Sequence, residues 1–314
     1  MLGPLVVVDG DRHLALPRGH ARALLALLAL RAGEVVSTER LIDQLWGPTP
    51  PPTAAKALHG LVSILRRRLE PDRDRRAGAT VVETRAPGYV LSLDRDQVDA
   101  HRFRSMLAAA AGAPAAAKAA LLREALELWR GPALDDFAYE PFAQAPIADL
   151  EESRLTALEE RVEADLALNR HAELVAELEG LTAEHPLRER LRGQLLLALY
   201  RCGRQAEALE VYRDAQRLFV DELGIEPSPA LQALQRSVLI QDPALDAPGA
   251  PVSLETRRSR LGVTRRGPGW RAAASWSPSS SPISPRSCCA ARTPTPRRHA
   301  RSCGGGGHAT PPAR

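Results

Sequence analysis

The sequence of 314 residues is 44% hydrophobic and 25% charged, a composition typical of a globular protein with room for two domains of ordinary size. No run of 18 apolar residues without a charge occurs, and residues 1–4 lack the basic start of a secretion signal. We therefore expect a cytoplasmic protein with no membrane association. Four cysteines are too few for a disulfide framework.

Charge is distributed unevenly along the chain. Residues 1–94 carry 13 Lys and Arg against 10 Asp and Glu, residues 100–245 carry 16 against 24, and residues 246–314 carry 12 against 2. An acidic middle opposes binding to a phosphate backbone but suits a partner-binding or dimerising surface. Only two of the 42 basic residues are lysine, a bias that fits GC-rich coding DNA, so the arginine excess alone says little about function.

The first elements alternate in type. Residues 5–16 predict a short hairpin around the turn signal Asp9-Gly10. Pro17 predicts the start of a leucine-rich helix that Gly33 ends.

Two further helices follow, separated by a stiff loop. Ser37 is a suitable cap for a short helix over residues 38–45, and the proline-rich stretch 48–52 cannot be helical. Thr53 is then expected to cap a third helix that runs to about Glu70. After a charged turn at 72–76, residues 81–91 predict a second hairpin turning at Pro87 and Gly88.

The middle of the chain, from Asp99 to about Ile240, has a nearly continuous helical pattern. When the sequence is compared with itself at an offset of 34 residues, the Ala-Glu pair at 172–173 aligns with the Ala-Glu pair at 206–207. A period of 34 residues is that of tetratricopeptide repeats. The expected fold is mixed: an N-terminal winged helix-turn-helix (α+β), followed by an all-α domain that resembles tetratricopeptide repeats.

The helix expected after Thr53 has two different faces. At 100° per residue, one side carries apolar residues and the other carries only donors and small residues. The apolar side comprises Ala54, Leu58, Leu61, Val62, Leu65 and Leu69. The other comprises Lys56, His59, Gly60, Ser63, Arg66 and Arg67. A helix face without carboxylates is what a DNA groove demands.

Lys56 adds a weaker indication. A cation in the first turn opposes the helix dipole by roughly 0.3–1 kcal/mol, so its presence suggests an external anion. The alternative is a merely solvated basic face, since arginines at 66–68 suit a helix C-terminus for the dipole alone. The context of helix, helix, proline-rich loop, helix and hairpin favours a winged helix that binds DNA.

At this point the sequence resembles a known family. Residues 22–28 (RALLALL), 41–47 (LIDQLWG), 62–69 (VSILRRRL) and 85–89 (RAPGY) resemble the OmpR-type winged helix, and more closely the SARP (AfsR/DnrI-type) transcriptional regulators. Residues 99–103 (DAHRF), 129–134 (WRGPAL) and 222–228 (ELGIEPS) resemble their bacterial transcriptional activator domain. The resemblance covers about residues 1–245.

The resemblance implies a sequence-specific transcriptional activator that binds direct repeats in double-stranded DNA as a homodimer and recruits RNA polymerase, with loop 46–52 near the polymerase. Secondary-metabolite genes are the targets it suggests. No enzymatic activity, cofactor or metal is expected. Carried over by position, the DNA-binding residues are Thr53, Lys56, His59, Ser63, Arg66, Arg67 and, on the wing, Arg85.

Two departures from the family pattern are visible. Ile64 stands where the family usually has arginine, so one phosphate or base contact is in doubt. No receiver domain precedes the winged helix, so control by phosphorylation is not expected.

The expected organisation has three parts: a winged helix over 1–94, an activator domain over 95–245 and a disordered basic tail over 246–314. The tail's composition also resembles GC-rich DNA translated out of frame. Its cysteines 288, 289 and 303 lack the spacing of a zinc site.

Two other classes of function stay open. An enzyme is disfavoured because no P-loop or His-Glu-x-x-His motif occurs, although a larger regulator that has lost an ATPase or cyclase module remains an alternative. A helical scaffold without DNA binding would account for the middle of the chain but not for the acid-free helix face.

Overall fold

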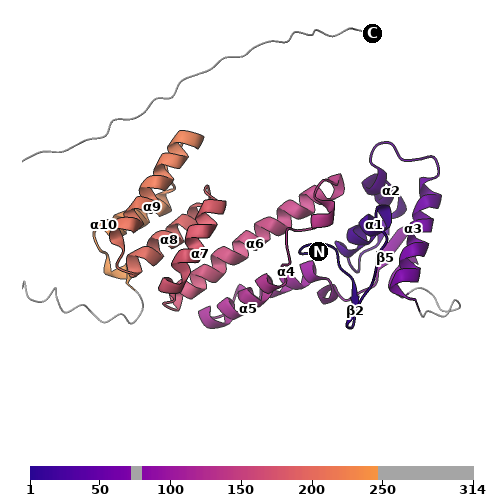
Figure 1. Cartoon of the computed structure of the whole chain (residues 1–314), viewed down its shortest axis with the longest axis horizontal. Helices are drawn as coiled ribbons and strands as arrows, with labels where there is room; N and C mark the ends of the chain where they lie inside the picture. Colours follow the sequence, from indigo (N-terminus) through magenta and orange to yellow (C-terminus); the bar gives the residue numbers. More distant parts are fainter. Residues whose placement is uncertain (72–79, 247–314) are drawn as a thin grey trace, which may run out of the picture. The chain divides into compact units, whose positions relative to one another are not determined.

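A computed structural model describes residues 1–71 and 80–246 (Figure 1). The charged turn predicted at 72–76 and the tail that follows Asp246, with its three cysteines, lie outside the described residues. No helix within the two described ranges is long and apolar enough to cross a membrane.

The first hairpin and helix form close to their predicted places. Strands β1 (Val8–Asp9) and β2 (Arg12–His13) pair antiparallel, so the two-residue loop lies one position later than the Asp9-Gly10 signal suggested. The first helix, α1 (His20–Ala29), does not begin at Pro17 as predicted. Gly19, with φ of 74°, takes the N-cap position because a positive φ suits glycine, and this turn redirects the chain into the helix.

The next two helices agree with the sequence pattern except in one cap. In α2 (Thr38–Trp46), Ser37 Oγ accepts a hydrogen bond from the backbone N–H of Arg40 at 3.2 Å, as predicted. The long helix α3 (Ala54–Leu69) begins after Thr53, but the Thr53 side chain makes no capping hydrogen bond. Its carbonyl accepts the first helical bond, from the N–H of Ala57 at 2.9 Å, but the predicted side-chain cap is wrong.

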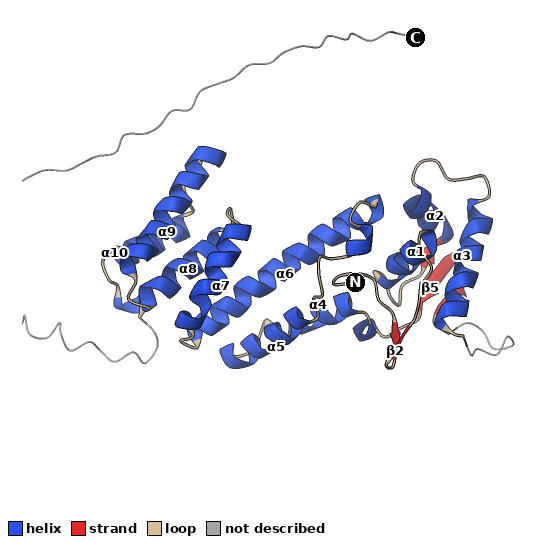
Figure 2. Ribbon diagram, viewed as in Figure 1, coloured by secondary structure: helices blue, strands red, loops and turns tan. Residues whose placement is uncertain are grey.

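A three-stranded antiparallel sheet has the order β3–β5–β4 (Figure 2). The predicted hairpin forms β4 (Val82–Arg85) and β5 (Gly88–Leu91), while β3 (Val36–Ser37) was not predicted, because two residues are too short to show a pattern. A Cβ on Gly88 would lie 1.9 Å from the Val36 carbonyl oxygen, so this close strand pairing requires glycine.

The rest of the described chain is helical. In order, its elements are η1 (Arg95–Gln97), α4 (Asp99–Ala110), α5 (Ala115–Glu127), η2 (Asp135–Phe137), α6 (Pro141–Ala167), α7 (His171–Glu184), α8 (Glu189–Arg201), α9 (Gln205–Leu218), η3 (Phe219–Leu223), α10 (Pro229–Leu239) and η4 (Pro243–Leu245). Helices α7 and α9 begin 34 residues apart, in agreement with the repeat seen in the sequence.

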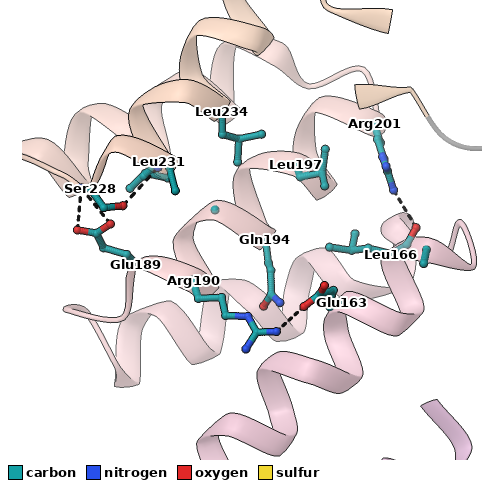
Figure 3. A pocket seen from close by; sticks show the side chains of 13 residues that line it. Glu163, Leu166, Glu189, Arg190, Gln194, Leu197, Arg201, Ser228, Leu231 and Leu234 are labelled. Carbon is teal, nitrogen blue, oxygen red and sulfur yellow. Dashed lines mark hydrogen bonds and ion pairs between the residues drawn. The ribbon is translucent and has the colours of Figure 1, made fainter. Parts of the chain in front are cut away.

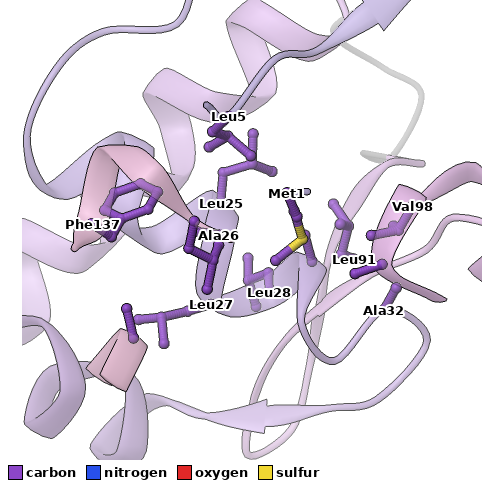
Figure 4. Packing of buried hydrophobic residues seen from close by; sticks show 14 of the residues in the cluster. Met1, Leu5, Leu25, Ala26, Leu27, Leu28, Ala32, Leu91, Val98 and Phe137 are labelled. Atoms are coloured by element: carbon purple, nitrogen blue, oxygen red, sulfur yellow. The ribbon is translucent and has the colours of Figure 1, made fainter. Parts of the chain in front are cut away.

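Two apolar clusters make up the core. The first contains residues of α1, α2, α3 and the sheet together with residues of α4, α5 and α6. The second contains residues of α6, α7, α8, α9 and α10. Figure 4 shows Met1 and Leu5 among the leucines of α1. The first cluster therefore continues across residue 94, the predicted domain boundary.

Polar contacts reinforce this continuity. Arg22 of α1 pairs with Asp136 of η2 at 2.7 Å, and the backbone N–H of Leu5 donates to the same carboxylate at 2.6 Å. Asp99, at the start of α4, accepts a hydrogen bond from the N–H of Leu2 at 3.1 Å. These three contacts connect the winged helix to the helical region.

Candidate nucleic-acid interface

Helix α3 has a buried side and an exposed side, as predicted. Its apolar residues Ala54, Leu58, Val62 and Leu65 are buried, while Leu61 and Leu69 are half-buried against the same core. On the opposite side, the exposed residues follow one line along the helix. This outer ridge consists of Lys56, His59, Gly60, Ser63 and Arg67.

The ridge is held by the two helices that precede it. Helix α3 packs against α1 and α2, with residues 47–53 as the connecting loop, the arrangement of a helix-turn-helix. The rings of His20 and Trp46 lie 5.1 Å apart at the end of α2, where the loop begins. Together with the sheet, α1 and α2 cover the apolar side of α3, and the outer ridge is left exposed.

The ridge is electropositive because its cations are not neutralised. Helix α3 contains no Asp or Glu, and Lys56 and Arg67 form no ion pair with any described residue. Ser63 Oγ donates to the carbonyl of His59 at 2.9 Å, so its lone pairs remain free to accept. The His59 ring stands edge-on to Tyr89 at 6.3 Å, which orients it relative to the sheet.

Arg66 differs from the other predicted site residues. Its Nε donates to the Val82 carbonyl at 2.8 Å and its Nη2 donates to Thr84 Oγ1 at 2.8 Å. Arg66 is half-buried and joins α3 to β4, whereas Arg67 next to it is exposed. Burial raises the pKa of Tyr89 in the same region, and the positive charge of Arg66 acts against that shift.

The hairpin of β4 and β5 forms the wing, and its cation Arg85 is partly neutralised. Arg85 is 56% exposed at the end of β4 and pairs with Glu83 at 2.9 Å. Hydrogen bonds from Ser92 and Arg85 lower the pKa of Glu83, so this carboxylate is ionised at neutral pH. At the wing turn, the Pro87 carbonyl accepts from the backbone N–H of Thr38 at 3.2 Å, so the tip is fixed to the start of α2.

The structure thus brings most predicted site residues to one surface. Lys56, His59, Ser63 and Arg67 share the ridge, Thr53 is exposed at its start, and Arg85 lies on the neighbouring wing. Arg68 is also exposed and was omitted, although the run of three arginines signalled it. Glu83 and Thr84 had no such signal, because their roles depend on strand register.

The outer ridge is suited to a polyanion, because its exposed side chains are hydrogen-bond donors and its cations form no ion pair among the described residues. The described residues contain no cluster of three His, Cys, Asp or Glu side chains that could hold a metal ion. Lys56 and Arg67 lie eleven positions apart, a rise of about 16 Å along the helix, which is long enough to contact several base pairs of a major groove.

Comparisons with known proteins agree with this geometry. Residues 15–91 match the family described as "Transcriptional regulatory protein, C terminal", and residues 93–239 match the "Bacterial transcriptional activator domain". The regulatory protein DnrI of Streptomyces peucetius is 39% identical over 267 residues, which cover 80% of this chain and 95% of DnrI. The regulatory protein AfsR of Streptomyces coelicolor is 44% identical over 250 residues.

The extent of the match differs between relatives. It covers 78% of this chain but only 24% of AfsR, so the chain spans about a quarter of that protein. Among solved structures, EmbR of Mycobacterium tuberculosis, in complex with a low-affinity phosphopeptide, superposes with a TM-score of 0.73 at 36% identity and covers 77% of this chain and 64% of EmbR. The winged helix and the helical domain are therefore shared in sequence and in fold.

Proposed function

The chain belongs to the SARP family of DNA-binding transcriptional regulators, and we propose that it activates transcription by reading direct repeats through the outer ridge of α3. The observation that supports this most directly is the ridge itself, an exposed and acid-free helix face with unneutralised cations. Both matched domains are regulatory, and neither brings an enzymatic activity to the chain.

In this proposal the ridge enters the major groove. Lys56 and Arg67 contact phosphates or guanine edges near the two ends of the ridge, and His59 and Ser63 contact bases between them. Arg85 contacts the neighbouring backbone from the wing. Arg66 acts indirectly, because its hydrogen bonds to β4 fix the position of the wing relative to the ridge.

Two chains would occupy neighbouring repeats and contact RNA polymerase. The family resemblance suggests a homodimer on DNA, with loop 46–52 near the polymerase. Residues 48–50 of this loop are exposed, so they are accessible to a partner protein. Secondary-metabolite genes are the proposed targets, by analogy with the family.

Selection from a random duplex pool tests the DNA part of this proposal. The full chain should enrich a motif repeated in one orientation at about one helical turn, 10–11 base pairs, with two chains bound per duplex in sedimentation. Failure to enrich any motif would overturn sequence-specific binding. Enrichment of inverted repeats would overturn the direct-repeat arrangement.

Transcription in vitro tests the polymerase part. With purified RNA polymerase and a template that carries the selected repeats, the chain should increase transcript yield. Thr49→Ala combined with Pro50→Ala should reduce that increase while DNA affinity is unchanged, because both residues lie in the exposed loop outside the ridge. Unchanged activation by this variant would contradict a polymerase contact in the loop.

A further inference from the structure

A cavity of about 600 Å³ lies in the helical domain, far along the chain from the outer ridge. It is formed by α6, α8 and α10, and most of its wall is apolar, from Leu166, Ala167, Gly193, Leu197, Leu231 and Leu234. Figure 3 shows Leu231 and Leu234 of α10 facing α8 across the cavity. Its size is that of a pocket for a small molecule.

The charged groups at the wall are mostly satisfied by the protein. Arg190 pairs with Glu163, and both carboxylate oxygens of Glu189 accept from the backbone N–H of Ser228 at 3.1 Å. These contacts leave little unsatisfied charge in that part of the cavity.

Arg201 is the exception. It is half-buried at the other end of the cavity, where its Nη1 donates to the Leu166 carbonyl at 2.8 Å (Figure 3). Its Nε donates to the Leu245 carbonyl, also at 2.8 Å. Neither acceptor carries a charge, and Arg201 forms no ion pair with residues 1–71 or 80–246. Burial lowers the pKa of Arg201, while the negative charge of Asp246 acts against that shift. A half-buried guanidinium with unused N–H donors is a suitable partner for a carboxylate.

A second polar group in the cavity wall, Gln194, has an acceptor left unpaired by the described residues, and a carboxylate would not contact it. Gln194 is 8% exposed, and its Nε2 donates to the Glu159 carbonyl at 2.7 Å. Its Oε1 accepts no hydrogen bond from the described residues. Apolar walls would leave the backbone groups of a bound peptide without partners, so a peptide is a poor fit. A small molecule with one charged end fits better.

From these features we infer that the cavity between α6, α8 and α10 binds a small apolar carboxylic acid, whose carboxylate pairs with Arg201 and whose hydrocarbon part lies between Leu197, Leu231 and Leu234. Arg201 and Gly193 are eight residues apart on α8, about 12 Å, which is close to the length of a saturated chain of about ten carbons. The inference is independent of DNA binding, because no residue of the outer ridge takes part.

Calorimetric titration of the full chain with decanoate, below its micellar concentration, tests this inference. Decanoate should bind at one site per chain, and 1-decanol, with the same hydrocarbon chain but no charge, should bind at least tenfold more weakly. Arg201→Gln should weaken decanoate binding at least tenfold. Arg190→Gln is the matched control, because Arg190 lines the same cavity but is already neutralised by Glu163.

A second variant distinguishes a loss of ligand binding from a loss of folding. Leu234→Phe keeps the wall apolar and reduces the free volume, so it should weaken decanoate binding while leaving the helical circular dichroism spectrum unchanged. The inference would be overturned if decanoate does not bind, if 1-decanol binds equally well, or if Arg190→Gln weakens binding as much as Arg201→Gln.

Discussion

Arg66 Nη2 donates a hydrogen bond to Thr84 Oγ1 at 2.8 Å, and this contact joins α3 to strand β4. A second bond from Arg66 Nε to the Val82 carbonyl, also 2.8 Å, fixes the guanidinium along β4. Two adjacent arginines of one helix therefore have different roles, because Arg67 is exposed and has no partner among the described residues.

The first prediction separates these two roles. Arg66→Ala should lower the free energy of unfolding by about 1–3 kcal/mol, since it removes two hydrogen bonds from a charged donor, and should weaken DNA binding through the wing. Arg67→Ala should change stability by no more than about 0.5 kcal/mol but still weaken DNA binding. Urea unfolding and fluorescence anisotropy on one selected duplex measure the two quantities. Equal stability of the two variants would contradict the structural role of Arg66.

Lysine occurs twice in the chain, which provides a matched pair for a second prediction. Lys56 lies on the outer ridge and has no ion-pair partner in residues 1–71 or 80–246, whereas Lys118 on α5 pairs with Glu160 at 3.1 Å. If Lys56 contacts a phosphate, Lys56→Ala should weaken binding and reduce the slope of log K against log salt by about 0.9. Lys118→Ala should leave both affinity and slope unchanged. An unchanged slope in Lys56→Ala would rule out that phosphate contact.

Much of the outer ridge could be predicted because its pattern is local. The stripe that buries Leu58 and Leu65 also determines that Lys56 and Ser63 are exposed, since both follow from the helical period. The capping role of Ser37 was equally local. Thr53 was a local prediction that failed, because its backbone has φ of −104° and ψ of 22°, outside the extended region typical of a capping residue.

The parts that could not be predicted depend on residues distant in sequence. Strand β3 exists only because Val36 meets Tyr89 across the sheet. Arg66 is separated by 18 residues from Thr84, and Arg22 by 114 residues from Asp136. No periodicity within one element indicates such pairs, so the shared core across residue 94 emerged only from the structure.

Gly60 provides a third prediction, because no contact among the described residues explains a glycine there. A Cβ at Gly60 would meet no atom within 4 Å, and glycine inside a helix costs roughly 0.5–1 kcal/mol relative to alanine. Close approach of the helix backbone to DNA would explain it. Gly60→Ala should therefore raise the free energy of unfolding by about that amount and weaken DNA binding in the anisotropy assay.

The matched control for this prediction is Gly180, an exposed glycine of α7 with no atom within 4 Å of an added Cβ. Gly180→Ala should stabilise the protein to a similar degree without changing DNA affinity. If Gly60→Ala retains full affinity, the backbone at position 60 does not approach the duplex closely.

The fourth prediction concerns Glu83 on the wing. Its carboxylate pairs with Arg85 at 2.9 Å and would lie near the DNA backbone if Arg85 contacts it. Glu83→Gln removes a negative charge and releases Arg85, so DNA affinity should increase and the salt slope should steepen by up to about 0.9. The double variant Glu83→Gln with Arg85→Ala should lose this gain. A gain that survives the removal of Arg85 would show that it arises elsewhere.

The last prediction follows from Asp136, which connects the winged helix to the helical domain. Burial acts to raise the pKa of Asp136, but the hydrogen bonds from Arg22 and the Leu5 N–H outweigh it, and the pKa lies below its ordinary value of 3.8. The ionised carboxylate therefore stabilises the folded chain above pH 3.8, and this contribution is lost as the pH falls through the lower, folded-state pKa.

Asp136→Asn should consequently lower the free energy of unfolding at pH 6 by about 1–3 kcal/mol, the range for hydrogen bonds to a charged group. Below pH 3.8 the difference from the unaltered chain should shrink as the pH falls, because protonation of Asp136 in the folded state removes the charge that pairs with Arg22. Asp149→Asn is the control: Asp149 also pairs with an arginine, Arg104, but its side chain is 64% exposed, and exposed pairs contribute at most about 1 kcal/mol. Urea unfolding between pH 2 and 6 measures both variants. A deficit in Asp136→Asn that persists undiminished at pH 2 would show that the carboxylate's charge does not hold Arg22 and Leu5 in place.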